Sequence, residues 1–80
     1  MERPRKENMT NAEVGKLLGL DHSTVSKLRS GARSPSMNTI KTVYEVMRWP
    51  MEFQFTAKIE DTYHHYFEAR IKDYVKTRTK

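Results

Sequence analysis

Two closely spaced pairs of helix start and stop signals constrain the fold of this chain most strongly. Thr10 and Glu13 have the spacing of a capping box, in which each side chain accepts a hydrogen bond from the other residue's backbone. Gly19 follows where a left-handed residue would end that helix. Asp21 is a favourable N-cap for a second short helix, which Gly31 closes. Two short helices joined by a tight glycine turn form a helix-turn-helix unit.

Apolar residues with helical spacing follow each start signal. Val14, Leu17 and Leu18 lie at positions i, i+3 and i+4 of the first segment. Val25 and Leu28 lie three apart in the second segment. Each short helix is therefore predicted to bury one side and to expose the other.

A third helix is predicted after the turn that ends at Pro35. Ser36 is its expected N-cap. The helix has to end before Trp49, because a residue that precedes a proline disfavours the helical conformation. Its apolar residues, expected to pack on the first two helices, are Met37, Ile40, Val43, Tyr44 and Met47.

The stretch 51–59 fits two structures. Its apolar residues alternate with polar ones, and this period of two predicts a short strand. Met51, Phe55 and Ile59 also lie four residues apart, and Pro50 suits the start of a helix, so a helix is the alternative.

A long C-terminal helix is expected to start after Asp61 or Thr62 and to reach about Arg78. Acidic residues at its start and basic residues at its end suit the helix dipole. Its predicted apolar face is formed by Tyr63, Tyr66, Phe67, Ile71, Tyr74 and Val75.

These segments predict one mainly α-helical domain. We expect a basic N-terminal arm at residues 1–8 and a helix-turn-helix core at residues 9–48. Residues 49–80 are expected to form a packing or dimerisation segment that folds with the core as one unit.

The charge of the chain indicates a polyanionic partner. Its 15 Lys and Arg residues exceed its 10 Asp and Glu residues, for a net charge of +5. Most of the excess lies within residues 9–48. The absence of Cys excludes a disulfide scaffold and a cysteine-based zinc site. Neither a membrane span nor a signal peptide is evident, so a cytoplasmic protein is expected.

No pattern in the sequence supports catalysis. The chain has no glycine-rich phosphate loop and no nucleophile with an adjacent base. His64 and His65 are adjacent, so on a helix they point about 100° apart and do not share one metal in the usual i, i+4 manner. We therefore expect neither an enzyme nor a metal or other cofactor.

The exposed side of the second helix has the chemistry of a DNA-reading surface. Its residues are small or polar, none is acidic, and only Lys27 is long and charged. Hydroxyls pair with base edges or phosphates, and Lys27 can reach guanine acceptors. The helix N-terminus also favours a nearby phosphate. The alternative is that these polar residues only form the solvent-exposed side of a helix. The residues of this side are His22, Ser23, Thr24, Ser26, Lys27 and Ser30.

Residues 9–40 resemble the Cro and lambda-repressor type helix-turn-helix family of phage and bacterial regulators, the XRE type. The resemblance covers about half of the chain. It is carried by the small residue Gly15, the turn Gly19-Leu20, the stretch STVSKL at 23–28, Ser30-Gly31, and Arg33 before Pro35-Ser36.

The resemblance implies a role for individual residues. Asn11 would touch a phosphate and brace the recognition helix. His22, Ser23 and Lys27 would face base edges. The sugar-phosphate backbone would be held by Thr24, Ser26, Ser30, Arg33 and Ser34.

The chain departs from the family pattern in two places. Family members usually have a further helix before the helix-turn-helix, whereas only the polar stretch MERPRKEN precedes Met9. We expect the aromatic C-terminal helix to cover that core surface, from the same chain or from a partner subunit. Gly15 stands where the family prefers alanine, which weakens the first helix by roughly 0.5–1 kcal/mol.

Length and resemblance together suggest a small bacteriophage Cro-like repressor in a bacterial host cell. Eighty residues leave no room for the self-cleaving domain of family repressors that respond to DNA damage. Helix 21–30 would enter the major groove of a palindromic operator in double-stranded DNA. We expect a homodimer through residues 50–75 and no membrane or small-molecule ligand. The alternative is a DNA-binding antitoxin whose C-terminal segment neutralises a toxin protein.

The basic N-terminal arm has two interpretations. Arms of this kind follow the minor groove or a line of phosphates, and a tail without DNA contacts is the alternative. The arm residues that would contact DNA are Arg3, Arg5 and Lys6.

Overall fold

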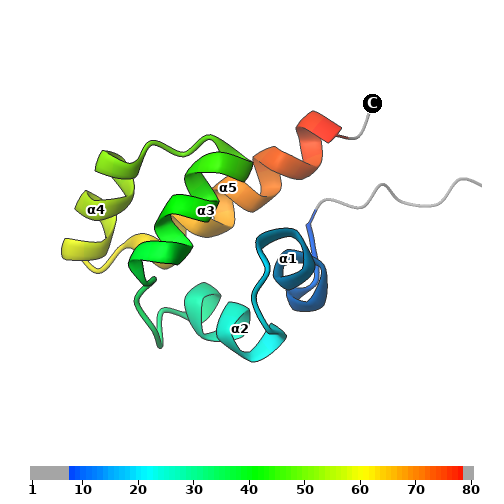
Figure 1. Ribbon diagram of the computed structural model, residues 1–80, viewed down its shortest axis with the longest axis horizontal. Coiled ribbons are helices and arrows are strands. Elements are labelled where there is room, and N and C mark those ends of the chain that lie inside the picture. Colours follow the sequence, from blue (N-terminus) through cyan, green and yellow to red (C-terminus); the bar gives the residue numbers. More distant parts are fainter. Residues whose placement is uncertain (1–7, 79–80) are drawn as a thin grey trace, which may run out of the picture.

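The computed structural model describes residues 8–78, which form five helices (Figure 1). They are α1 (Asn11–Leu18), α2 (His22–Ser30), α3 (Met37–Met47), α4 (Met51–Ile59) and α5 (Tyr63–Arg78). No strand occurs within residues 8–78. The prediction of a mainly α-helical fold is confirmed. None of these described helices combines the length and the apolar composition that a bilayer crossing requires.

The predicted start and stop signals bound α1 and α2. Both hydrogen bonds of the capping box form: Glu13 N donates to Thr10 Oγ1 at 3.1 Å, and Thr10 N donates to Glu13 Oε1 at 2.8 Å. Gly19 and Gly31 end the two helices with φ of 72° and 86°. This left-handed conformation costs residues with a Cβ roughly 1–2 kcal/mol, which glycine avoids. Local sequence therefore sets both ends of the helix-turn-helix.

Gly15 is buried where α1 meets the turn. Its carbonyl accepts a hydrogen bond from Leu20 N at 2.8 Å. A Cβ at this position would lie 2.4 Å from Leu20 O, far inside van der Waals contact. The glycine that lowers the helix propensity of α1 is thus required for the close approach of the turn.

The third helix, α3, begins and ends as predicted. Ser36 caps it by accepting a hydrogen bond from Thr39 N at 3.3 Å. Ile40 is fully buried. Met37 and Tyr44 were predicted on the same stripe but are 59% and 41% exposed, because both lie at one edge of it.

Residues 51–59 form α4, so the predicted strand is wrong and the helical alternative is correct. Alternation would place Gln54 on the solvent side, yet its side chain is fully buried. Gln54 Nε2 donates to Ile40 O at 2.9 Å and to Trp49 O at 2.8 Å, and its Oε1 accepts from the Tyr63 hydroxyl at 2.7 Å. Burial raises the pKa of Tyr63, so this hydroxyl remains a donor. These partners lie outside 51–59, which is why the local pattern did not reveal them.

The C-terminal helix α5 covers the core of the helix-turn-helix. Phe67 and Ile71 have no exposed surface and belong to one cluster with Val14 of α1 and Val25 of α2. Figure 1 shows α5 passing behind α3. The α5 helix of the same chain therefore packs against the core of the helix-turn-helix.

The sequence predicts no helix before Met9, and the structure describes only Asn8 and Met9 of this stretch. Asn8 and Met9 are not helical. The remainder of that prediction falls on residues 1–7, which lie outside the described residues.

The aromatic face of α5 is narrower than predicted. Tyr63 and Phe67 are buried, and the ring of Tyr63 lies 4.8 Å from that of Trp49 and 5.7 Å from that of Phe67 between centroids. Tyr74 is half-buried, whereas Tyr66 is 56% exposed because it lies to one side of the row at 63, 67 and 71.

Candidate nucleic-acid interface

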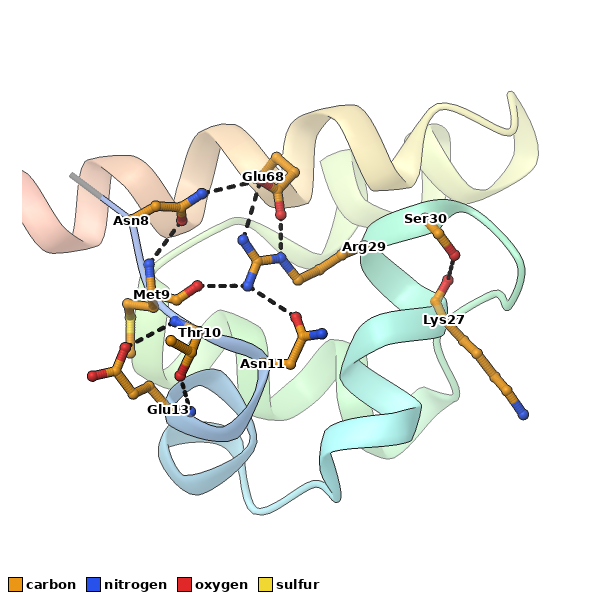
Figure 2. A network of polar contacts seen from close by, with 9 residues as sticks. All are labelled: Asn8, Met9, Thr10, Asn11, Glu13, Lys27, Arg29, Ser30 and Glu68. Atoms are coloured by element: carbon orange, nitrogen blue, oxygen red, sulfur yellow. Dashed lines mark hydrogen bonds and ion pairs between the residues drawn. The ribbon is translucent and has the colours of Figure 1, made fainter. Parts of the chain in front are cut away.

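One exposed side of α2 carries the residues predicted to face DNA. Val25 and Leu28 are buried on the opposite side, where α1 and α5 pack. Figure 2 shows the Lys27 side chain extending away from α5. The exposed residues are His22, Ser23, Ser26, Lys27 and Ser30, and Thr24 is half-buried.

A hollow of about 230 Å³ lies between α2 and the N-terminus of α3. Thr24, Arg33 and Ser34 line it, so the structure brings together three residues predicted to hold the DNA backbone. Arg33 N donates to Lys27 O at 3.2 Å, which holds the loop against the end of α2. The Ser30 hydroxyl donates to the same Lys27 carbonyl at 3.2 Å, so Ser30 also helps to end the helix (Figure 2).

Asn11 lies at the start of α1, beside the last turn of α2. Its Oδ1 accepts a hydrogen bond from Arg29 Nη1 at 3.1 Å. This contact joins α1 to α2, and the bracing role that the family resemblance implied for Asn11 stays a prediction. The phosphate contact of Asn11 stays a prediction.

Arg29 and Glu68 form an ion pair that the sequence analysis missed. Arg29 turns inward from α2, and its Nε and Nη2 both donate to the Glu68 carboxylate of α5 (Figure 2). Its Nη1 also donates to Met9 O at 2.7 Å. Arg29 lies four residues after Val25, on the buried side of α2. This spacing could have indicated that Arg29 points inward.

The Glu68 carboxylate is held in its charged form. Partial burial raises its pKa, but the hydrogen bond and the positive charge of Arg29 outweigh this effect, so the pKa lies below its usual value. Asn8 Nδ2 adds a hydrogen bond at 3.4 Å. One ion pair therefore connects α2, α5 and the chain that enters α1.

Asp21 occupies the N-cap position of α2 but does not cap the backbone with its side chain. Its Oδ2 accepts from Ser23 Oγ at 2.7 Å, and its Oδ1 accepts from Thr24 Oγ1 at 2.5 Å. These two hydroxyls, Thr24 first, lower the pKa of Asp21 to about 2. An ionised carboxylate thus lies directly beside two residues of the predicted DNA surface.

A family model described as helix-turn-helix matches residues 5–48. The chain belongs to this helix-turn-helix family. The match supports the resemblance to XRE-type regulators of the Cro and lambda-repressor kind. Neither a search of curated proteins nor a search of solved structures gave a match.

Family membership shows that this helix-turn-helix protein is a DNA-binding transcription regulator. The matched residues include α1, α2 and α3, and with them the exposed side of α2 and the hollow between α2 and α3. Proteins of this family are regulatory and are not typically catalytic.

Two predictions concern residues away from the helix-turn-helix surface. The predicted arm contacts Arg3, Arg5 and Lys6 lie outside the described residues. His65 is exposed and His64 half-buried, with ring centroids 4.3 Å apart. Among residues 8–78 no group of three or more metal-ligating side chains is assembled.

Proposed function

We propose that the chain is a Cro-like repressor that inserts α2 into the major groove of a palindromic operator. The exposed side of α2 is the observation that supports this most directly. Its side chains are small or polar and only Lys27 is long and charged, while Arg29 of the same helix turns inward to Glu68. A helix with this profile can approach base edges closely. Repression follows because a bound protein occludes a promoter.

The proposed contacts divide into two kinds. His22, Ser23 and Lys27 face base edges. The sugar-phosphate backbone is held by Asn11, Thr24, Ser26, Ser30, Arg33 and Ser34. Thr24 and Arg33 share the hollow beside the N-terminus of α3, whose positive dipole end favours a phosphate.

Two substitutions test this division. Lys27→Ala is expected to relax preference at one base pair and to weaken cognate binding by about 1–3 kcal/mol. Arg33→Ala is expected to weaken binding to all sequences uniformly and to reduce the salt slope by about 1. Titration of both variants against cognate and substituted duplexes measures this. A uniform loss with Lys27→Ala would assign that residue to the backbone.

Dimerisation through residues 50–75 is the second part of the proposal. One short recognition helix reads few base pairs, and two-fold pairing doubles the sequence that is read. Phe53, Ile59 and Tyr66 are 60%, 84% and 56% exposed. Phe53 and Tyr66 line a groove of about 280 Å³ between α4 and α5. Trp49 also lines this groove. An exposed apolar surface of this kind is typical of an interaction site, and the proposal is that a second copy of the chain binds to it.

Phe53→Glu and Tyr44→Glu form a matched pair of variants for this surface. Both introduce one negative charge at an exposed aromatic residue, but Tyr44 does not line the groove. Sedimentation with a palindromic duplex is expected to show dimers for the wild type and Tyr44→Glu, and monomers for Phe53→Glu. Wild-type monomers, both free at high concentration and on the duplex, would remove the dimer from the proposal.

The exposed groove also supports the antitoxin alternative. An antitoxin would present an apolar C-terminal surface when its toxin is absent, as α4 and α5 do here. Tight operator binding by the purified chain alone favours the repressor. Sequence-specific binding that requires a second protein seated on Phe53 favours the antitoxin.

The arm residues Arg3, Arg5 and Lys6 are proposed to contact phosphates or the minor groove. Deletion of residues 2–7 is then expected to lower the salt slope of log K by roughly two to three units. An unchanged slope would leave the arm without DNA contacts.

A further inference from the structure

The first turn of α2 places a carboxylate beside two hydroxyls of the DNA-facing surface. Asp21 accepts hydrogen bonds from Ser23 at 2.7 Å and from Thr24 at 2.5 Å. Asp21 and Ser23 are exposed, whereas Thr24 is half-buried beside the hollow. Of the two hydroxyls, that of Ser23 is therefore the one open to a base edge.

The direction of these hydrogen bonds is fixed by chemistry. An ionised carboxylate only accepts hydrogen bonds, and the two hydroxyls hold the pKa of Asp21 at about 2. Each hydroxyl carries one hydrogen, which points at Asp21. Ser23 consequently offers only lone pairs to its remaining surroundings.

Base edges in the major groove differ in this respect. Adenine N6 and cytosine N4 carry amino groups that donate, whereas guanine O6 and N7 and thymine O4 only accept. A Ser23 hydroxyl that offers lone pairs is matched to an amino group and mismatched to the acceptors. A free serine hydroxyl, which rotates, pairs with either kind.

Asp21 also changes what the N-terminus of α2 attracts. Backbone N–H groups at a helix N-terminus favour a phosphate. The exposed Asp21 carboxylate supplies negative charge at that same end and repels a phosphate. Ser23, whose only hydroxyl hydrogen is donated to this carboxylate, is thus better suited to a base edge than to a phosphate.

We propose that Asp21 is a specificity-determining residue that holds Ser23 as a hydrogen-bond acceptor, so that α2 selects adenine or cytosine at the position Ser23 reads. The proposal rests on the proposed function, because it requires α2 in the major groove. It adds a base class and a residue that acts through its neighbour.

Selection of bound duplexes from a random pool tests the proposal with Asp21→Ser, Ser23→Ala and the double variant. Serine is an N-cap as good as aspartate, so Asp21→Ser preserves α2 while removing the carboxylate. Circular dichroism confirms the helix content of each variant. Glu45→Ala is the control, since it also removes one exposed negative charge and lies on α3.

The wild type is expected to enrich adenine or cytosine at one position of each half-site. Asp21→Ser should lower that preference about five- to tenfold and leave the other positions unchanged. Ser23→Ala should lower it equally, and the double variant should lower it no further, because both residues act through one hydrogen bond. Glu45→Ala should keep the wild-type motif.

Two results would overturn the proposal and separate it from the proposed function. An unchanged motif for Asp21→Ser, with the same uniform gain in affinity as Glu45→Ala, would reduce Asp21 to a general charge effect. In that case the repressor function stands. A wild type that enriches no motif overturns both.

Discussion

The first two helices and the next two end in different ways. α1 and α2 end at Gly19 and Gly31, which have positive φ. Glycine is the residue that adopts this conformation most readily, so the sequence itself indicates both helix ends. The corresponding left-handed positions after α3 and α4 are occupied by Arg48 and Asp61, with φ of 61° and 59°. The helix-turn-helix is therefore bounded by local signals, whereas the C-terminal half is held in place by contacts with the rest of the molecule.

Gln54→Ala is expected to have the largest effect, because it removes the contact that ties α4 to α3 and α5. The substitution removes the hydrogen bonds that Gln54 makes with the Tyr63 hydroxyl and with two backbone carbonyls, and it opens a cavity. We expect a loss of about 3–5 kcal/mol in the free energy of unfolding. Urea denaturation measures it, with Glu52→Ala on the exposed side of α4 as the control. Equal losses for the two variants would show that this network does not hold α4.

Gly15→Ala tests the local signals of the first half. Helix propensity alone would make alanine stabilising by roughly 0.5–1 kcal/mol. Because its Cβ would lie 2.4 Å from Leu20 O, we expect a loss of about 1–3 kcal/mol instead. Chemical denaturation distinguishes the two signs, and a stabilised variant would contradict the requirement for glycine. Lys16→Ala, at an exposed position of α1, should change stability by less than about 0.5 kcal/mol.

Glu68→Gln probes the junction between the two halves. The variant leaves the Arg29 guanidinium without its carboxylate partner, and we expect a loss of about 1–2 kcal/mol at neutral pH. Asp73→Asn on the same helix, at an exposed carboxylate, is the matched control with a change below about 0.5 kcal/mol.

The stability difference between the wild type and Glu68→Gln is expected to depend on pH. The pKa of Glu68 is lower in the folded chain than its usual value, so its stabilising effect is complete above the usual pKa of glutamate. It is lost as the pH falls through the folded-state pKa. The stability difference between the wild type and Glu68→Gln should therefore shrink on acidification. A difference that persists in acid would contradict the ion pair as its source.

Arg48→Gly and Asp61→Gly are expected to have the smallest effect and the opposite sign. Glycine relieves the left-handed strain of roughly 1–2 kcal/mol but increases the entropy of the unfolded chain. A net gain of about 0.5 kcal/mol in unfolding free energy is expected for each. A loss in both variants would show that the side chains of Arg48 and Asp61 contribute more than their backbone strain costs.

The two halves also differ in how far the sequence predicts them. Thr10, Glu13 and Gly19 act within one helix, so their spacing was sufficient to place α1. Gln54 could not be placed in this way, because its partners lie on α3, on α5 and at Trp49. The exposed side of α2 followed from the buried positions of Val25 and Leu28.

The polar contacts of α2 could not be predicted from the sequence pattern. Arg29 was counted only as positive charge, yet its partner Glu68 lies on a helix 39 residues away along the chain. Asp21 was expected to cap the backbone, but its carboxylate instead accepts hydrogen bonds from the hydroxyls of Ser23 and Thr24. Both cases depend on which of several available hydrogen-bond partners a side chain binds, and the folded geometry decides this.

Selection of bound duplexes from a random DNA pool by the purified wild-type chain is the most direct test of sequence-specific reading by α2. An enriched palindromic motif, bound without any other protein and with half-site centres about 34 Å apart, is the expected result. Salt-sensitive binding without an enriched motif would contradict it, because α2 would then hold the DNA backbone without reading its bases.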